Sequence, residues 1–92
     1  MPVIAPILHM NGDRANTLLA NLEHAYAACR KALDALHECA GNARNFYPSP
    51  GRWEDYCDQH QARQAHIQAV MDALVEECEA IQAQISPTRP RP

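Results

Sequence analysis

The fold of this chain is decided by the stretch GNARNFYPSPG, residues 41–51, which interrupts two long helix-forming segments. Pro48 and Pro50 have no backbone N–H to donate, and each disfavours helical geometry in the residue before it. The segments on both sides are rich in alanine and leucine, which favour helix. This stretch therefore predicts a turn between two helices.

Apolar residues recur at alternating intervals of four and three on each side of the turn. Such spacing keeps side chains on one face of a helix. The first stripe consists of Ala15, Leu19, Leu22, Tyr26, Cys29, Leu33, Leu36 and Ala40, and the second of Trp53, Cys57, His60, Gln64, Ile67, Met71, Leu74, Cys78, Ile81 and Ile85. We therefore predict an all-α fold in which two long antiparallel helices, over residues 14–40 and 50–84, form a helical hairpin.

The predicted hairpin occupies residues 13–85, with its turn at 41–49. Asp13 is the expected N-cap of the first helix, and Gly41 is the expected glycine just beyond its end. Ser49 followed by Pro50 is typical of a helix start.

The segments outside the hairpin are an extended arm over residues 1–12 and a disordered tail over residues 86–92. Because the arm is apolar, we expect it to lie against the hairpin, against a second subunit, or over the aromatic residues of the turn.

Folding the hairpin back brings Leu36 or Leu33 near His60, a polar step in the second stripe that can fix the register. Two helices alone cover only part of their stripes, and Val70 and Val75 widen the second stripe beyond what one helix covers. We therefore expect a homodimer, most simply a four-helix bundle. The residues expected in its core or dimer interface are Leu22, Leu33, Ile67, Val70, Met71, Leu74 and Val75.

The formal net charge of −3 disfavours binding to nucleic-acid phosphates, and no run of about 18 apolar residues predicts a membrane span. Residues 1–10 lack the features of a secretion signal, so we expect the chain to stay in a reducing host cytoplasm with its cysteines as apolar side chains. An acidic cluster on the second helix, typical of a solvated face, leaves open a docking patch for a basic partner or nucleic-acid mimicry. It comprises Asp72, Glu76, Glu77 and Glu79.

The set of residues that most resembles a metal site consists of His37, Cys39, Cys57 and His60. His37 and Cys39 lie about 200° apart around a helix and cannot both face one ion. A Cys39–Cys57 disulfide is sterically easier but is disfavoured in a reducing compartment. The sequence also lacks the spacing of a nucleophile with its base, a phosphate-binding loop and metal-binding motifs. We therefore predict no metal, no cofactor, no catalytic residue and no enzymatic activity.

Four of the five aromatic residues fall within residues 46–56, at the turn. They can form a small core that closes the end of the bundle. Alternatively, they form a recognition patch together with a nearby arginine, a composition in which binding hot spots are enriched. The candidate partner-binding residues are Arg44, Phe46, Tyr47 and Asp55.

Two short motifs, HMNG at residues 9–12 and NARNFYP at residues 42–48, bracket the first predicted helix. In them the chain resembles small uncharacterised proteins of phages and prophages, whose motifs read HLNG and NGRDYYP, and the similarity spans most of the chain. The resemblance implies an origin in a bacterial virus or mobile element and carries no enzymatic activity. We expect a small accessory protein that binds, and inhibits or redirects, a host protein. A phage assembly or scaffold component and an acidic nucleic-acid mimic are the alternatives.

Overall fold

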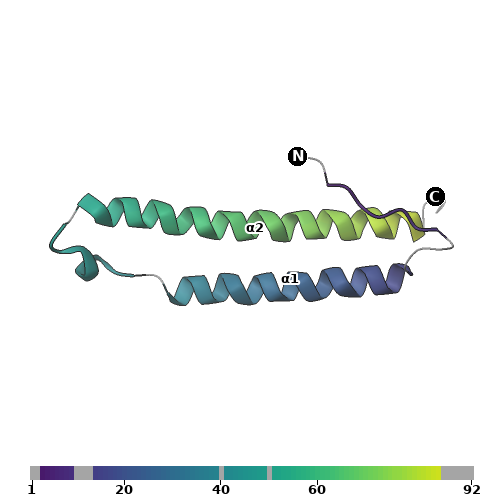
Figure 1. Ribbon diagram of the computed structural model, residues 1–92, viewed down its shortest axis with the longest axis horizontal. Coiled ribbons are helices and arrows are strands. Elements are labelled where there is room, and N and C mark those ends of the chain that lie inside the picture. Colours follow the sequence, from purple (N-terminus) through teal and green to yellow (C-terminus); the bar gives the residue numbers. More distant parts are fainter. Residues whose placement is uncertain (1–2, 10–13, 40, 50, 86–92) are drawn as a thin grey trace, which may run out of the picture.

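The computed structural model describes residues 3–9, 14–39, 41–49 and 51–85. It contains two long helices, α1 (Ala15–Glu38) and α2 (Gly51–Ile85), joined by a loop that holds the short 3-10 helix η1 (Ala43–Phe46). The two long helices lie side by side and antiparallel in a rod of 62 × 25 × 23 Å (Figure 1). The predicted all-α helical hairpin is confirmed.

The first helix ends at Glu38, two residues earlier than predicted. Cys39 is its C-cap, and the next described amide, that of Gly41, donates a 2.8 Å hydrogen bond to the Tyr56 hydroxyl instead of extending the helix. Gly41 lies two residues beyond the C-cap and does not adopt a positive φ, so the prediction that it is the glycine closing the helix is wrong. A Cβ atom at this position would be tightly packed, at 3.4 Å from the Tyr56 hydroxyl and 3.3 Å from Asn45 Oδ1.

The N-cap position of α1 belongs to Arg14, whose side chain makes no capping hydrogen bond. The second helix extends to Ile85, one residue beyond its predicted end, and the amide of Arg52 donates to the carbonyl of Ser49 at 3.0 Å. Several predicted features lie outside the described residues: Asp13 as N-cap, Ala40 as helix end, Pro50 as first helical residue, and the tail over residues 86–92.

The core between the helices is thin. Among the described residues, only Met71, Ile81 and His60 are buried, and α1 contributes none of them. Among the other predicted core residues, those half-buried are Leu22, Leu33, Ile67 and Leu74, whereas Val70 and Val75 are 51% and 44% exposed. The solvent-accessible surface area of the chain is 7501 Å², compared with roughly 5,400 Å² for a compact protein of this mass. The rod therefore exposes more surface than a compact protein of its mass, and the side chains of Val70 and Val75 are part of that surface.

Residues 3–9 form an extended arm beside the C-terminal part of α2, at the end of the rod opposite the turn (Figure 1). The Gln84 carboxamide holds this arm at two points: the amide of Leu8 donates to Oε1, and Nε2 donates to the carbonyl of Pro6, both at 2.8 Å. The arm cannot cover the turn, one of its predicted places, because α1 is roughly 36 Å long and begins at the far end.

Candidate functional site

Four aromatic rings pack together at the turn end of the hairpin. Phe46 comes from η1, and Trp53, Tyr56 and His60 follow at intervals of three and four along one face of α2. The ring centroids lie 5.1 Å apart for Phe46–Tyr56, 5.7 Å for Phe46–Trp53, 5.9 Å for Trp53–Tyr56 and 5.8 Å for Tyr56–His60. These are favourable separations for aromatic pairs. We call this set the aromatic cluster. Of the four aromatic residues expected to form a small core at the turn, it contains Phe46, Trp53 and Tyr56, whereas Tyr47 is 70% exposed.

The aromatic cluster also binds the end of α1. The last carbonyls of a helix have no partner within that helix. His60 is the hydrogen-bond partner of one of these carbonyls, because its Nε2 donates to the carbonyl of Leu36 at 2.8 Å. A carbonyl only accepts, so Nε2 carries a proton, whereas Nδ1 is buried and has no hydrogen-bond partner. The predicted proximity of Leu36 and His60 is confirmed.

The loop before the cluster is fixed by hydrogen bonds from the backbone to two asparagine side chains. Asn42 Oδ1 accepts from the amide of Arg44 at 2.9 Å, and the amide of Asn42 donates to Asn45 Oδ1 at 3.0 Å. This is a capping box at the start of η1. The sequence interpretation missed it, although two asparagines three positions apart before an aromatic residue were a usable signal.

The structure separates the four candidate partner-binding residues. Phe46 is half-buried in the aromatic cluster and supports the loop. The next residue, Tyr47, is 70% exposed, and Arg44 and Asp55 are exposed as well. Arg44 and Tyr47 line a shallow hollow of about 480 Å³. We call the exposed residues Arg44, Tyr47 and Asp55 the tip surface.

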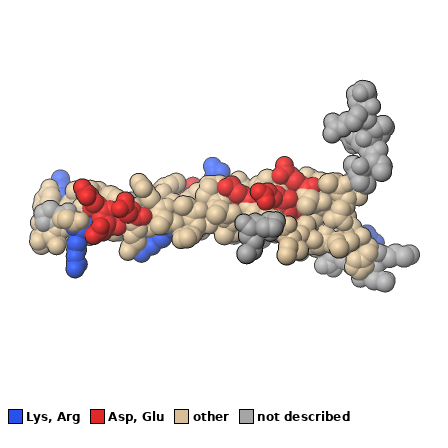
Figure 2. Space-filling view, turned by 90° about the horizontal axis from the view of Figure 1, so that it is seen from above, with Lys and Arg blue, Asp and Glu red and all other residues tan. Residues whose placement is uncertain are grey.

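Acidic side chains gather in two groups over α2, one at the turn end and one toward the C-terminal half (Figure 2). The exposed acidic residues of these two segments are Glu54, Asp55 and Asp58 in the first and Asp72, Glu76 and Glu79 in the second. The second group contains most of the predicted acidic cluster, while Glu77 is half-buried.

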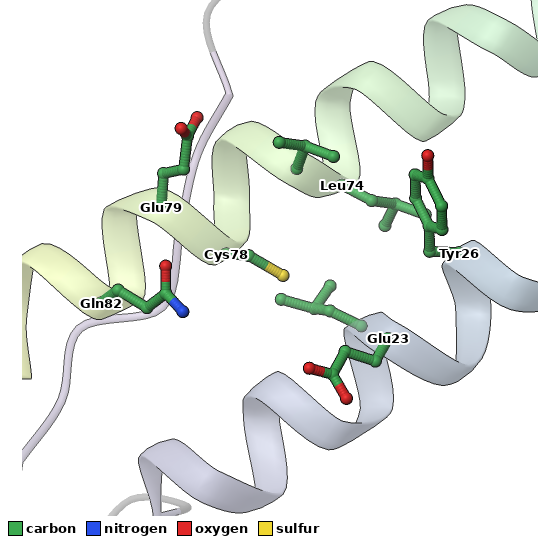
Figure 3. A pocket seen from close by; sticks show the side chains of 8 residues that line it. Glu23, Tyr26, Leu74, Cys78, Glu79 and Gln82 are labelled. Atoms are coloured by element: carbon green, nitrogen blue, oxygen red, sulfur yellow. The ribbon is translucent and has the colours of Figure 1, made fainter.

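A second hollow, of about 290 Å³, lies between α1 and the C-terminal half of α2. Its lining residues are Leu22, Glu23, Tyr26, Leu74, Val75, Cys78, Glu79 and Gln82. The Cys78 sulfur points into the space between the helices, with Glu23 on α1 and Glu79 on α2 (Figure 3). Burial, followed by the nearby carboxylates of Glu23, Glu77 and Glu79, raises the pKa of the Cys78 thiol above its ordinary value of 9.0. This thiol is therefore protonated at neutral pH.

Two of the four residues considered for a metal site, Cys39 and His60, make hydrogen bonds to the backbone of α1. Cys39 is exposed, and its Sγ donates to the carbonyl of Leu36 at 3.4 Å, while His60 bonds to the same carbonyl. All four cysteines are free thiols. Within the described part of the chain, no three His, Cys, Asp or Glu side chains come together as a metal would require.

No family model, curated protein or solved structure significantly matches the chain. None of the described helices has the length and apolar character needed to cross a membrane. Two surfaces stand out as places for a partner to bind: the tip surface on its braced loop, and the apolar hollow with its acidic edges.

Proposed function

We propose that this chain is a small non-enzymatic accessory protein of phage type, which acts in the host cytoplasm by binding a host protein through its tip surface. The exposure of Tyr47 carries this proposal. A large aromatic side chain remains 70% exposed although its neighbour Phe46 packs into the aromatic cluster. Tyrosine and arginine are among the residues that contribute most to binding energy at protein interfaces.

The loop that holds Tyr47 supports a binding role because it is already ordered. The Asn42–Asn45 capping box fixes one side of it, and the 2.8 Å bond from the amide of Ser49 to the carbonyl of Phe46 fixes the other. A pre-organised loop loses less conformational entropy when it binds.

No catalytic role is proposed for the groups that could react. His60 donates to a main-chain carbonyl and is stacked on Tyr56, and burial together with nearby carboxylates raises the pKa of the Cys78 thiol, which disfavours the reactive thiolate. These contacts support a structural role for both side chains.

A matched pair of arginine variants tests the tip surface. Tagged wild-type protein, Arg44→Ala and Arg63→Ala are used to capture proteins from a bacterial lysate, and the retained proteins are quantified by mass spectrometry. Arg63 serves as the control because it is also exposed but lies roughly 18 Å along α2 from the start of that helix. We expect Arg44→Ala to lose a stoichiometric host protein that Arg63→Ala retains. Equal retention by all three proteins contradicts the tip surface, and retention of phage structural proteins supports an assembly role instead.

We also propose that two copies associate along the Val70 side of the hairpin as a four-helix bundle. The elongated hairpin has a solvent-accessible surface of 7501 Å², and a stable interface would bury about 800 Å² of it on each partner. Val70 is half exposed at the edge of the apolar stripe.

Light scattering tests the dimer. At micromolar concentrations we expect a mass of about 20 kDa, twice the 10.3 kDa of the chain. Val70→Asp should give the single-chain mass, because a dimer would bury its carboxylate without a partner. A wild-type mass of one chain contradicts the dimer.

A further inference from the structure

We infer that the hollow between α1 and α2 is a docking groove for an amphipathic helix of a partner protein, one whose apolar stripe is flanked by lysine or arginine. We call this hollow the acidic-edged groove. It lies on a different part of the hairpin from the tip surface, and its role does not depend on the function proposed for the tip.

The floor of the groove is apolar and has no third helix to cover it. Leu22, Tyr26 and Leu74 are only half-buried, and Val75 is 44% exposed. From Leu74 to Gln82 the groove follows α2 for roughly 12 Å, about two helical turns. This length suits the spacing of apolar side chains at positions i, i+3 or i+4, and i+7 of a docked helix.

The edges of the groove are acidic on both helices. Glu23 belongs to α1 and Glu79 to α2; both line the groove and are exposed, and the Glu79 side chain points away from α1 (Figure 3). The residues that line the groove include neither lysine nor arginine. Basic residues on both sides of an apolar stripe would therefore lie opposite complementary charges.

The same charges disfavour a second copy of this chain as the occupant. A two-fold axis through the groove would bring Glu23 and Glu79 of both copies toward one another. A dimer on the Val70 side avoids this, because Val70 and Val75 lie about 140° apart around α2.

The chain's own arm does not fill the groove either. It is bound by Gln84, which lies about 200° around α2 from the groove residue Gln82. The arm and the groove are thus on opposite sides of the helix.

Alkylation of Cys78 by iodoacetamide measures occupancy of the groove directly. In a variant whose other cysteines are replaced by alanine, Cys78 is the single thiol. Two synthetic helical peptides of about 18 residues, or five turns, serve as probes. Both carry the same leucine stripe, flanked by lysine in one and by glutamate in the other. We expect the lysine peptide to slow alkylation about tenfold at saturation and the glutamate peptide to have no effect at the same concentrations.

Two double variants in the same background provide the charge control. Glu23→Gln/Glu79→Gln should weaken binding of the lysine peptide about tenfold. Glu54→Gln/Asp58→Asn removes the same charge at the turn end of α2 and should leave binding unchanged. Equal protection by both peptides, or equal weakening in both double variants, overturns the inference.

Measuring alkylation of Cys78 over a series of protein concentrations, without peptide, tests whether a second copy of the chain occupies the groove. If alkylation of Cys78 slows as the protein becomes more concentrated, a second copy fills the groove and the inference is wrong. Tyr47→Ala should leave the peptide results unchanged, so a failure at the groove is separable from a failure at the tip surface.

Discussion

The imidazole of His60 joins the two helices through the backbone, because its Nε2 donates to the carbonyl of Leu36 at 2.8 Å. His60 is 6% exposed, and its ring is held by stacking on Tyr56, whose hydroxyl in turn accepts from the amide of Gly41. One face of α2 thus provides two polar groups to the end of α1. In a hairpin with so thin a core, these contacts fix where α1 ends and how the two helices align.

Replacing His60 by alanine should strongly destabilise the protein. It removes the donor to the Leu36 carbonyl and the stacking neighbour of Tyr56, and we expect a loss of about 2–3 kcal/mol in the free energy of unfolding. His66, an exposed histidine on the same helix, is the control, and His66→Ala should change this free energy by less than about 0.5 kcal/mol. Chemical denaturation measures both values. If His60→Ala lowered the free energy of unfolding as little as His66→Ala does, the Leu36–His60 bond would not stabilise the hairpin.

The two described glycines should respond in opposite directions to alanine. In Gly41→Ala, the new methyl group is crowded by Asn45 Oδ1 and the Tyr56 hydroxyl, both of which are already hydrogen bonded. We expect a loss of about 1 kcal/mol, or 4–8 °C in Tm. Gly51 begins α2, and no atom lies within 4 Å of the place that an alanine methyl group would take, so Gly51→Ala should stabilise by about 0.5 kcal/mol. A rise in Tm for Gly41→Ala would show that close approach is not why glycine stands there.

The arm should detach when Gln84 loses its carboxamide. Gln84→Ala removes the bonds to Leu8 and Pro6, and we expect the amide of Leu8 to exchange with solvent deuterium about tenfold faster. Gln82→Ala removes the same type of side chain from the acidic-edged groove and should leave that exchange rate unchanged. Unaltered exchange in Gln84→Ala would mean that other contacts hold the arm.

The helical hairpin was predictable because periodicity and the two prolines act over short distances in the sequence. The alternating stripes located both helices, and the register brought Leu36 near His60 as expected. The early end of α1 was not predictable in this way, since the amide of Gly41 bonds to a hydroxyl 15 residues away. The place of the arm depends equally on Gln84, which lies 76 residues from Leu8.

The candidate site was predictable only in part. The density of aromatic residues identified the turn, but the amino-acid composition could not distinguish a buried role for Phe46 from an exposed role for Tyr47. The structure packs Phe46 against Trp53 and Tyr56 and leaves Tyr47 exposed, because consecutive residues in a tight loop point in different directions. The acidic-edged groove requires side chains from both helices and could not be read from either stripe alone.

The most direct test of the central claim is the amount of host protein that Tyr47→Ala retains from a bacterial lysate, relative to wild type. Because Tyr47 is exposed, the Tm of the Tyr47→Ala variant should stay within about 2 °C of the wild-type value. Phe46→Ala, which disrupts the aromatic cluster, should lower Tm by about 8 °C or more. We predict that Tyr47→Ala remains folded and loses the captured protein. Full retention by Tyr47→Ala, or a fall in its Tm as large as that of Phe46→Ala, would contradict the tip surface as the site of recognition.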